Sequence, residues 1–402
     1  MEYSENRLAD YSEDSAIGRG SIDVPFLLLV LLLLTIGVVM VLSASFARAY
    51  YSAATKHTST YYFTRQLFFA VTGVAIMLLA SRFPIGFYRR FSGVLLLFSI
   101  VMLLLVLVGG VRANGARRWF AIGSITFQPS EIAKIAVILF EAQLICRFKD
   151  RMGTFRYGVL PFGLTAAVIV GLLVLEPHLS ASIIIILVTA VMMFIGGARL
   201  FWFLLGFGAV GLGGLIAINV LDYSSERISA WLDPFADTSD TGYQIVQSLY
   251  AIGSGGLSGL GLGNGRQKYL YLPEEHNDFI FSVVCEELGF IGATLILILF
   301  ALLIARGFFL ALHCRDRYSF LVCSGVTALL AIQVILNVAV VTNLVPCTGI
   351  SLPFFSYGGT ALWLQLAEMG VILSISRDVP EKKFIKPGQK KKARGGKAGA
   401  EA

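Results

Sequence analysis

Hydrophobic residues in this chain fall in long runs that are separated by short polar segments. A helix needs about 20 apolar residues to cross the roughly 30 Å hydrocarbon core of a bilayer, and many of the runs approach or exceed that length. The pattern predicts an all-α polytopic integral membrane protein of about ten helices. We expect these helices near 24–46, 66–81, 91–109, 130–146, 158–175, 179–196, 201–221, 279–305, 318–343 and 359–376.

Composition supports this assignment. Hydrophobic residues make up 56% of the 402 positions and charged residues only 14%. The first run, VPFLLLVLLLLTIGVVMVLSAS, is too long for the core of a cleavable signal peptide, so we expect a retained first helix. The five cysteines have no CxxC spacing, which argues against a disulfide framework or a zinc site.

Basic residues predict the orientation. They concentrate in every second connection and in the C-terminal tail, and the positive-inside rule then puts both termini in the cytoplasm. We expect a cytoplasmic tail over 1–23, a membrane domain over 24–376 and a basic cytoplasmic tail over 377–402, which would attract membrane lipids. This orientation leaves one large extracytoplasmic loop, 222–278, between the seventh and eighth spans.

The segment GGVRANGARRWFAIGSITFQPSEIAK puts basic residues on the expected outer side, where they are normally scarce. Arg112, Arg117 and Arg118 lie in the loop, and Glu131 and Lys134 share a face of the following helix at i, i+3 spacing. One interpretation is an interfacial loop with an intrahelical ion pair. The other is a receptor for an anionic headgroup, because the planar fork of arginine suits phosphate and pyrophosphate.

The long outer loop contains a glycine-dense stretch, GSGGLSGLGLGNGRQKYLYLPEEHND. Glycines allow tight turns and close approach of the backbone to a ligand. No GK[ST] follows and no strand is predicted before the stretch, so it is not a Walker-type phosphate loop.

The loop ends in PEEHNDFIF, a charged cluster at the threshold of the eighth span. Asn277 or Asp278 is a natural helix N-cap, but a carboxylate at this boundary would also be basic enough to take a proton from a hydroxyl. His276 has no metal-ligand spacing around it, so a positioning role is favoured over a metal site. Glu286 and Glu287 would need partners inside the bundle.

Four long motifs carry a resemblance to a known family: GARRWFAIGSITFQPSEIAK, AWLDPFAD, GYQIVQSLYAIGSGGLSGLGLGNGRQKYLYLPEEHNDFIFSVVCEELGFIGA and TGISLPFFSYGGT. In this order, over about 24–376, they resemble the SEDS proteins FtsW, RodA and SpoVE. The combination of GNGRQKYLYLPEEHNDFIF with VLSAS after the first span is most similar to FtsW.

This resemblance implies a peptidoglycan glycosyltransferase of the bacterial plasma membrane that polymerises lipid II at the outer face. The implied site is the division septum. The implied partners are a class B penicillin-binding protein, other divisome proteins and membrane lipids, with no role for nucleic acid. RodA- or SpoVE-like roles in elongation or sporulation are the alternatives within the family.

The resemblance also implies residue roles. The essential aspartate of the family's P-E-x-x-x-D-F motif falls on Asp278, the arginine of its GxxRW motif on Arg118, and the pair of its QPxExxK motif on Glu131 and Lys134. Members with a glutamate a few positions before Pro-Glu have no counterpart here, where Leu270 or another apolar residue stands. The remaining polar residues that we assign to substrate binding are Arg117, Arg266, Lys268, His276, Ser356 and Tyr357.

The implied reaction forms a β bond where the donor had an α bond, so it needs one displacement and a base on the acceptor side, which would be Asp278. Undecaprenyl pyrophosphate leaves without an acid but needs positive charge, from Arg117, Arg118, Lys134 or a divalent cation such as Mg²⁺ or Mn²⁺.

Two other function classes stay open. A lipid II flippase would also bind pyrophosphate, but it would need charges deep in the bundle, alternating access and often inverted repeats. A non-catalytic division scaffold would use the same spans and tail without needing an aspartate at Asp278.

Overall fold

The structure is a computed structural model of the 402-residue chain. It describes residues 20–113, 116–123, 125–206, 208, 211, 231–236 and 242–379.

Long helices dominate these residues, as predicted. Every expected span except 201–221 coincides with a helix or, at 158–175, with a helix pair; 201–221 lies mostly outside the described residues. Among the residues that the structure describes, eight helical segments are long and apolar enough to cross a membrane. The helices are α2 (Val24–Tyr51), α3 (Tyr61–Ala80), α4 (Ile85–Gly109), α5 (Pro129–Phe148), α6 (Phe155–Gly158), α7 (Leu160–Leu175), α8 (Leu179–Gly196), α11 (Tyr243–Gly255), α12 (Ile280–Leu312), α13 (Arg317–Val341) and α14 (Gly359–Ser376), with short 3-10 turns η1 (Ala53–Thr55) and η2 (Lys149–Gly153).

The helix α5 is the predicted span that composition alone does not mark as membrane-crossing. Glu131, Lys134 and Glu141 lie within it, and it is surrounded by α4, α8 and α13 at the centre of the bundle. Glu141 is fully buried and accepts a hydrogen bond from the Thr189 hydroxyl at 2.8 Å. Neighbouring helices therefore shield its charged groups from lipid, which explains how a span of lower hydropathy is accommodated.

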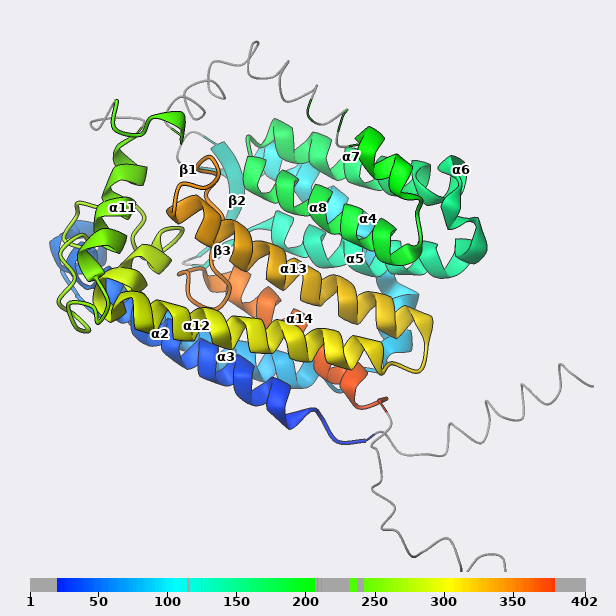
Figure 1. Ribbon diagram of the computed structural model, residues 1–402, viewed down its shortest axis with the longest axis horizontal. Coiled ribbons are helices and arrows are strands. Elements are labelled where there is room, and N and C mark those ends of the chain that lie inside the picture. Colours follow the sequence, from blue (N-terminus) through cyan, green and yellow to red (C-terminus); the bar gives the residue numbers. More distant parts are fainter. Residues whose placement is uncertain are drawn as a thin grey trace, which may run out of the picture.

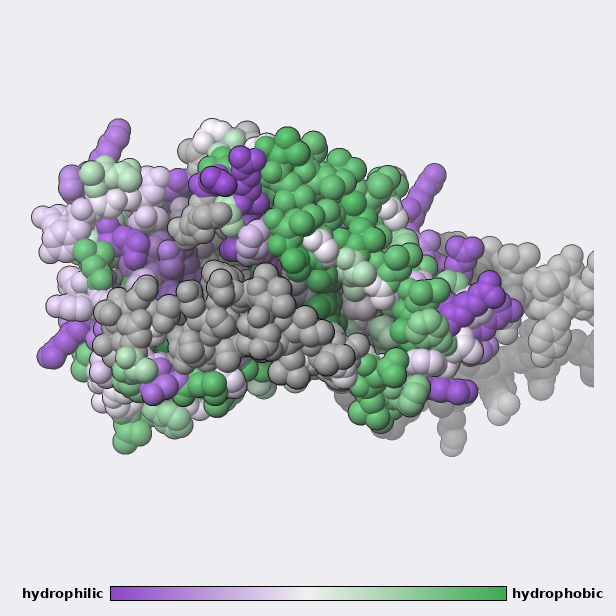
Figure 2. Space-filling view, turned by 90° about the horizontal axis from the view of Figure 1, so that it is seen from above, coloured by the Kyte–Doolittle hydropathy of each residue, from purple (hydrophilic) through white to green (hydrophobic). Residues whose placement is uncertain are grey.

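Both ends of the described chain lie at the same end of the bundle (Figure 1). Asp23 caps α2 by accepting from the Phe26 amide at 2.9 Å, and its carboxylate also pairs with Arg306 near the end of α12. The amide of Gly20 donates to the Arg377 carbonyl at 3.0 Å. Hydrophobic side chains cover much of the face shown in Figure 2, and hydrophilic ones gather towards its ends, as expected for a bundle that lipid surrounds.

A small sheet interrupts the helical pattern. The segment before α5, which we expected to be a loop, forms three antiparallel strands: β1 (Val111–Ala113), β2 (Ala116–Ile122) and β3 (Ile125–Phe127), in the order β1-β2-β3. Aromatic and β-branched residues favour strands, and Gly123 at φ +64° occupies the turn between β2 and β3. The sheet rests on the start of α14, where the Thr360 hydroxyl donates to the Thr126 carbonyl at 2.9 Å.

The helix α12 is broken at Gly289, which has φ +66° and ψ −173°. The glycine-rich loop restores the interrupted hydrogen-bond ladder: Leu260 and Gly261 donate to the carbonyls of Glu286 and Glu287, each at 3.0 Å. A side chain at position 289 would overlap the backbone of this loop, so only glycine fits. The glycine stretch thus fixes the outer segment of α12, the one that follows Asp278.

Candidate active site

A cavity of about 460 Å³ opens at the end of the bundle opposite the two chain ends. Its walls come from the sheet and from the outer ends of α3, α5, α8, α11, α13 and α14, together with the loops before α12 and α14. Six of the sequence-predicted site residues line it: Arg118, Glu131, Lys134, Asp278, Ser356 and Tyr357. Arg117, Arg266, Lys268 and His276 are not among its lining residues.

Asp278 is not a helix cap. The N-cap of α12 is Phe279, and no side chain caps that helix end, so the alternative of a capping Asn277 or Asp278 is wrong. The carbonyl of Asp278 is held by the Asn337 side-chain amide at 2.8 Å, whereas its carboxylate accepts no hydrogen bond from any described residue. This carboxylate faces the cavity with its lone pairs available to a ligand.

The surroundings of Asp278 make it a stronger base than an ordinary carboxylate. Burial first, and then the charge of Glu274, raise the pKa of Asp278 to about 6, against the opposing effect of the Arg118 charge. Gly349, at φ +68°, brings its backbone so close that an added Cβ would lie 3.0 Å from the Asp278 Oδ2 atom. The carboxylate therefore lies in a pocket that a glycine keeps open.

The two adjacent arginines have different surroundings. Arg118 on β2 lines the cavity together with Trp119, whereas Arg117 is exposed and does not line it. Arg117 donates to the carbonyls of Leu107 and Val108 at the end of α4. Its guanidinium therefore ties the sheet to the end of α4. The arginine whose charge acts on Asp278 is Arg118.

Arg118 is oriented by the short connection between α7 and α8. Its Nε atom donates to the Glu176 carbonyl at 3.1 Å, and its Nη2 atom donates to the Pro177 carbonyl. The Glu176 carboxyl is buried, which raises its pKa to about 8 despite the nearby Arg118 charge. The guanidinium of Arg118 thus brings a positive charge to the cavity wall in a fixed orientation, which suits an anionic ligand.

Lys134 and Glu131 share one face of α5, as their spacing predicted. The Nζ atom of Lys134 lies 2.7 Å from the Glu131 carboxylate, and both side chains are largely buried while they line the cavity. This pair is neutral as a unit. Lys134 therefore supplies less net charge to a pyrophosphate than Arg118 does.

The charged cluster before α12 divides into two parts. Glu274 lines the cavity with Asp278, whereas Glu275 is fully buried and forms a bidentate ion pair with Arg48 of α2, at 2.7 Å for both contacts. His276 packs between Tyr62 and Tyr357, with ring centroids 4.6 and 5.7 Å away, and burial lowers its pKa to about 3. Glu275 and His276 thus fix the loop that carries Asp278, as the positioning role of His276 anticipated.

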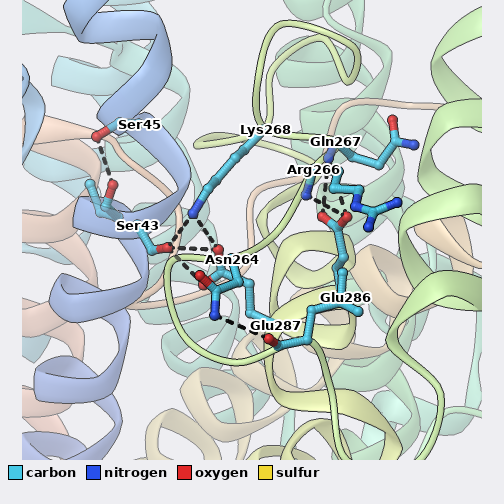
Figure 3. Close-up of polar contacts among 10 residues, drawn as sticks. Ser43, Ser45, Asn264, Arg266, Gln267, Lys268, Glu286 and Glu287 are labelled. Atoms are coloured by element: carbon cyan, nitrogen blue, oxygen red, sulfur yellow. Dashed lines mark hydrogen bonds and ion pairs between the residues drawn. The ribbon is translucent and has the colours of Figure 1, made fainter.

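Lys268 and Arg266 contact α12 rather than the cavity (Figure 3). The buried Nζ atom of Lys268 lies 2.6 Å from the Glu287 carboxylate, which also accepts from Ser43 of α2 at 2.7 Å. The Arg266 amide donates to the Glu286 carboxylate at 2.7 Å, while its side chain is exposed. Glu286 and Glu287 therefore have the partners that their burial requires, and the substrate-binding assignments of Arg266 and Lys268 have no support in this geometry.

Ser356 and Tyr357 belong to the loop before α14. The Ser356 hydroxyl donates to the Asn277 carbonyl and accepts from the Leu352 amide, and the Tyr357 amide donates to the His276 carbonyl at 2.8 Å. Both residues line the cavity and join this loop to the one that carries Asp278.

Six further residues line the cavity and were not predicted from the sequence: Arg65, Gln128, His178, Gln333, Gly349 and Gln365. They come from separate elements and share no local spacing, so only the fold brings them together. The one local signal was the polar EPH stretch between two apolar runs, which contains His178. Burial, followed by the charges of Arg118 and Lys134, lowers the pKa of His178 to about 3 and keeps it neutral.

Comparisons with known proteins agree with this architecture. Residues 24–381 match the family FTSW_RODA_SPOVE, described as "Cell cycle protein". "Stage V sporulation protein E" of Bacillus subtilis (strain 168) is 41% identical over 364 residues, covering 89% of this chain and 98% of that protein. "Probable peptidoglycan glycosyltransferase FtsW" of Trichlorobacter lovleyi is 40% identical, covering 88% of this chain and 93% of that protein.

A solved structure shares the fold. It is described as "Structural coordination of polymerization and crosslinking by a peptidoglycan synthase complex", with a TM-score of 0.75 at 30% identity over 90% of this chain and 99% of that one. The family match spans the whole of the predicted membrane domain, from the start of α2 to beyond the end of α14. The chain is therefore a multi-pass membrane protein that belongs to the FtsW/RodA/SpoVE family.

Proposed function

We propose that this protein is a peptidoglycan glycosyltransferase that polymerises lipid II at the outer face of the bacterial plasma membrane. The observation that carries the proposal is the Asp278 carboxylate, which lies in the cavity with a raised pKa and without a hydrogen-bond donor among the described residues. The similarity to proteins named as peptidoglycan glycosyltransferases supports the same reaction class.

In the proposed reaction, Asp278 accepts the proton of a sugar hydroxyl on one lipid II. The hydroxyl oxygen attacks the anomeric carbon of a second lipid II, and the bond from that carbon to the pyrophosphate oxygen breaks with its electron pair. A carboxylate with a pKa of about 6 is mostly ionised at neutral pH yet closer in basicity to the proton it removes than an ordinary aspartate.

The departing pyrophosphate requires positive charge, and Arg118 is the cavity residue best suited to supply it. Its position is fixed by two carbonyls of the α7–α8 connection, so little reorganisation is needed when the charge develops. Lys134 would contribute after partial release from Glu131.

The described residues contain no group of three or more His, Cys, Asp and Glu side chains that could hold a metal. Magnesium is commonly held by one or two carboxylates together with substrate phosphates. If Mg²⁺ or Mn²⁺ takes part, the pyrophosphate oxygens would supply its main ligands, and the ion would neutralise charge on the leaving group.

We propose further that the enzyme works beside a class B penicillin-binding protein in the division septum. The complex with which it shares its fold couples polymerization and crosslinking. An apolar groove of about 570 Å³ between α12 and α13, lined by Phe300, Ala301, Ala305, Ala331 and Ala339 among others, would accept the single membrane helix of such a partner, because small residues let helix backbones approach closely. The comparable similarity to a sporulation protein makes a sporulation role the alternative.

The test is glycan-strand formation from lipid II by the purified protein, alone and with its partner, in the presence of moenomycin to block contaminating glycosyltransferases. Asp278→Asn keeps the size of the side chain but removes the base, and a lost general base costs on the order of a hundredfold to ten-thousandfold in rate. Glu274→Gln at equal expression is the matched control, because it changes the neighbouring cavity carboxylate and should retain most of the activity. Polymerisation by Asp278→Asn at the parental rate would refute the proposed mechanism.

A further inference from the structure

Gln333 is a buried amide with nothing to bind in the described structure. It lies on α13, is only 2% exposed and lines the cavity. No hydrogen bond joins its amide to another described residue, and its polar atoms are not among the fully buried unpaired ones, so they reach the open space of the cavity. An amide that reaches a cavity without a protein partner is available to water and to a ligand that displaces the water.

Gln365 on α14 lines the same cavity, and only the carbonyl oxygen of its side-chain amide has a partner among the described residues. Its Oε1 atom accepts from the Phe354 backbone amide at 3.2 Å, which fixes the orientation of the side chain. The Nε2 group then remains without a partner within the described chain, and Gln365 also lines the cavity. The two glutamines offer donors and an acceptor from helices on either side of the loop that carries Gly349.

The position of Gln333 relative to Asp278 indicates which part of a substrate it would meet. Asn337, one helical turn further along α13, donates to the Asp278 carbonyl at 2.8 Å and to the Ile350 carbonyl at 2.6 Å. Residues four apart on a helix are neighbours on one face, at roughly 6 Å between their Cβ atoms. Gln333 therefore lies one helical turn from the residue that holds the Asp278 backbone, and it lines the same cavity as Asp278, whereas the cation Arg118 reaches the cavity from the sheet.

We infer that Gln333 and Gln365 form a neutral subsite that binds the hydroxyl and acetamido groups of the acceptor sugar beside Asp278. An amide that both donates and accepts matches hydroxyl and acetamido groups, each of which also does both, but it offers no net charge to a pyrophosphate. The cavity is thus divided by chemistry: Arg118 recognises the anionic leaving group, and the glutamines recognise the sugar. This inference rests on the proposed lipid II substrate.

The test compares two lipids that share the pyrophosphate and differ in the sugar. In Gln333→Met, which keeps the length of the side chain and removes its hydrogen bonds, KM for lipid II should rise about tenfold, because a sugar group is left buried without a partner. Inhibition by undecaprenyl pyrophosphate, which has no sugar, should be unchanged. Arg118→Ala should show the opposite pattern, with the larger loss for undecaprenyl pyrophosphate.

The matched control is Gln143→Met. This residue is on the same helix as Lys134 but bonds to the Ser92 hydroxyl of α4 and does not line the cavity, so KM should stay parental. Binding of both lipids to the Asp278→Asn protein repeats the comparison without turnover. If the unmodified protein does not polymerise lipid II, the proposed function fails. The sugar subsite still stands if Gln333→Met, combined with Asp278→Asn, weakens binding of lipid II and leaves binding of undecaprenyl pyrophosphate unchanged. A parental KM in Gln333→Met, or equal weakening for both lipids, overturns the subsite.

Discussion

The pH dependence of polymerisation gives the most direct test of the site. With a pKa of about 6 for Asp278, roughly nine tenths of the molecules carry the carboxylate at pH 7 and roughly one tenth at pH 5. The base acts only when deprotonated, so kcat/KM should fall by about tenfold between these two pH values. An aspartate at its ordinary pKa of 3.8 would give a nearly flat profile over that range.

The variant Glu274→Gln distinguishes titration of Asp278 from titration of another group in the protein. The Glu274 charge contributes to the raised pKa of Asp278, so removing it should move the acidic limb of the profile to lower pH. Arg118 acts in the opposite direction, and Arg118→Ala should move the limb to higher pH in whatever activity remains. The assay is initial-rate glycan formation from lipid II in buffers of constant ionic strength, with co-purification of the partner checked at each pH. A limb that stays in place in Glu274→Gln would refute Asp278 as the titrating base.

Four further outcomes follow from the geometry. Arg118→Lys should recover little of the polymerisation lost in Arg118→Ala, since one ammonium cannot replace the guanidinium fork; equal activity of the two variants would contradict a directional contact. Gly349→Ala should abolish most activity but leave the protein folded, as thermal unfolding would measure, because its methyl would lie 3.0 Å from the Asp278 carboxylate; a fully active variant would contradict that close approach. Glu275→Gln should lower the free energy of unfolding by about 2–3 kcal/mol, since it breaks the buried pair with a partly exposed Arg48, and an unchanged unfolding midpoint would contradict this structural role. Ser254→Cys in a background without native cysteines should react with impermeant thiol reagents in intact spheroplasts, whereas labelling only after membrane disruption would reverse the predicted orientation.

The roles within PEEHNDF illustrate why a motif alone could not assign its members. The sequence places Glu274, Glu275, His276 and Asp278 within five positions, and nothing in their spacing separates a catalytic group from a structural one. Glu275 pairs with Arg48, 227 residues away, and this partner decides its role. The same holds for Lys268, whose ammonium group forms an ion pair with Glu287 and donates a hydrogen bond to the Ser43 hydroxyl.

The positions of the membrane helices could be predicted from the sequence alone. The length of an apolar run relative to the bilayer is a local property, so the helices could be placed without any knowledge of their neighbours. The i, i+3 pair of Glu131 and Lys134 was equally local, and the structure has it as predicted. The motifs that resemble the family were read directly from the chain.

The set of residues that line the cavity, in contrast, depends on the folded chain. Arg118 lines it and Arg117 does not, and the segment that carries both is a strand where a loop was expected. Gln333, Gln365 and Gly349 lie in three elements, and no sequence spacing relates them to Asp278. The physical reason is that burial, hydrogen-bond partners and electrostatic environment depend on which helices pack together, and these long-range contacts leave no periodic signal in the sequence.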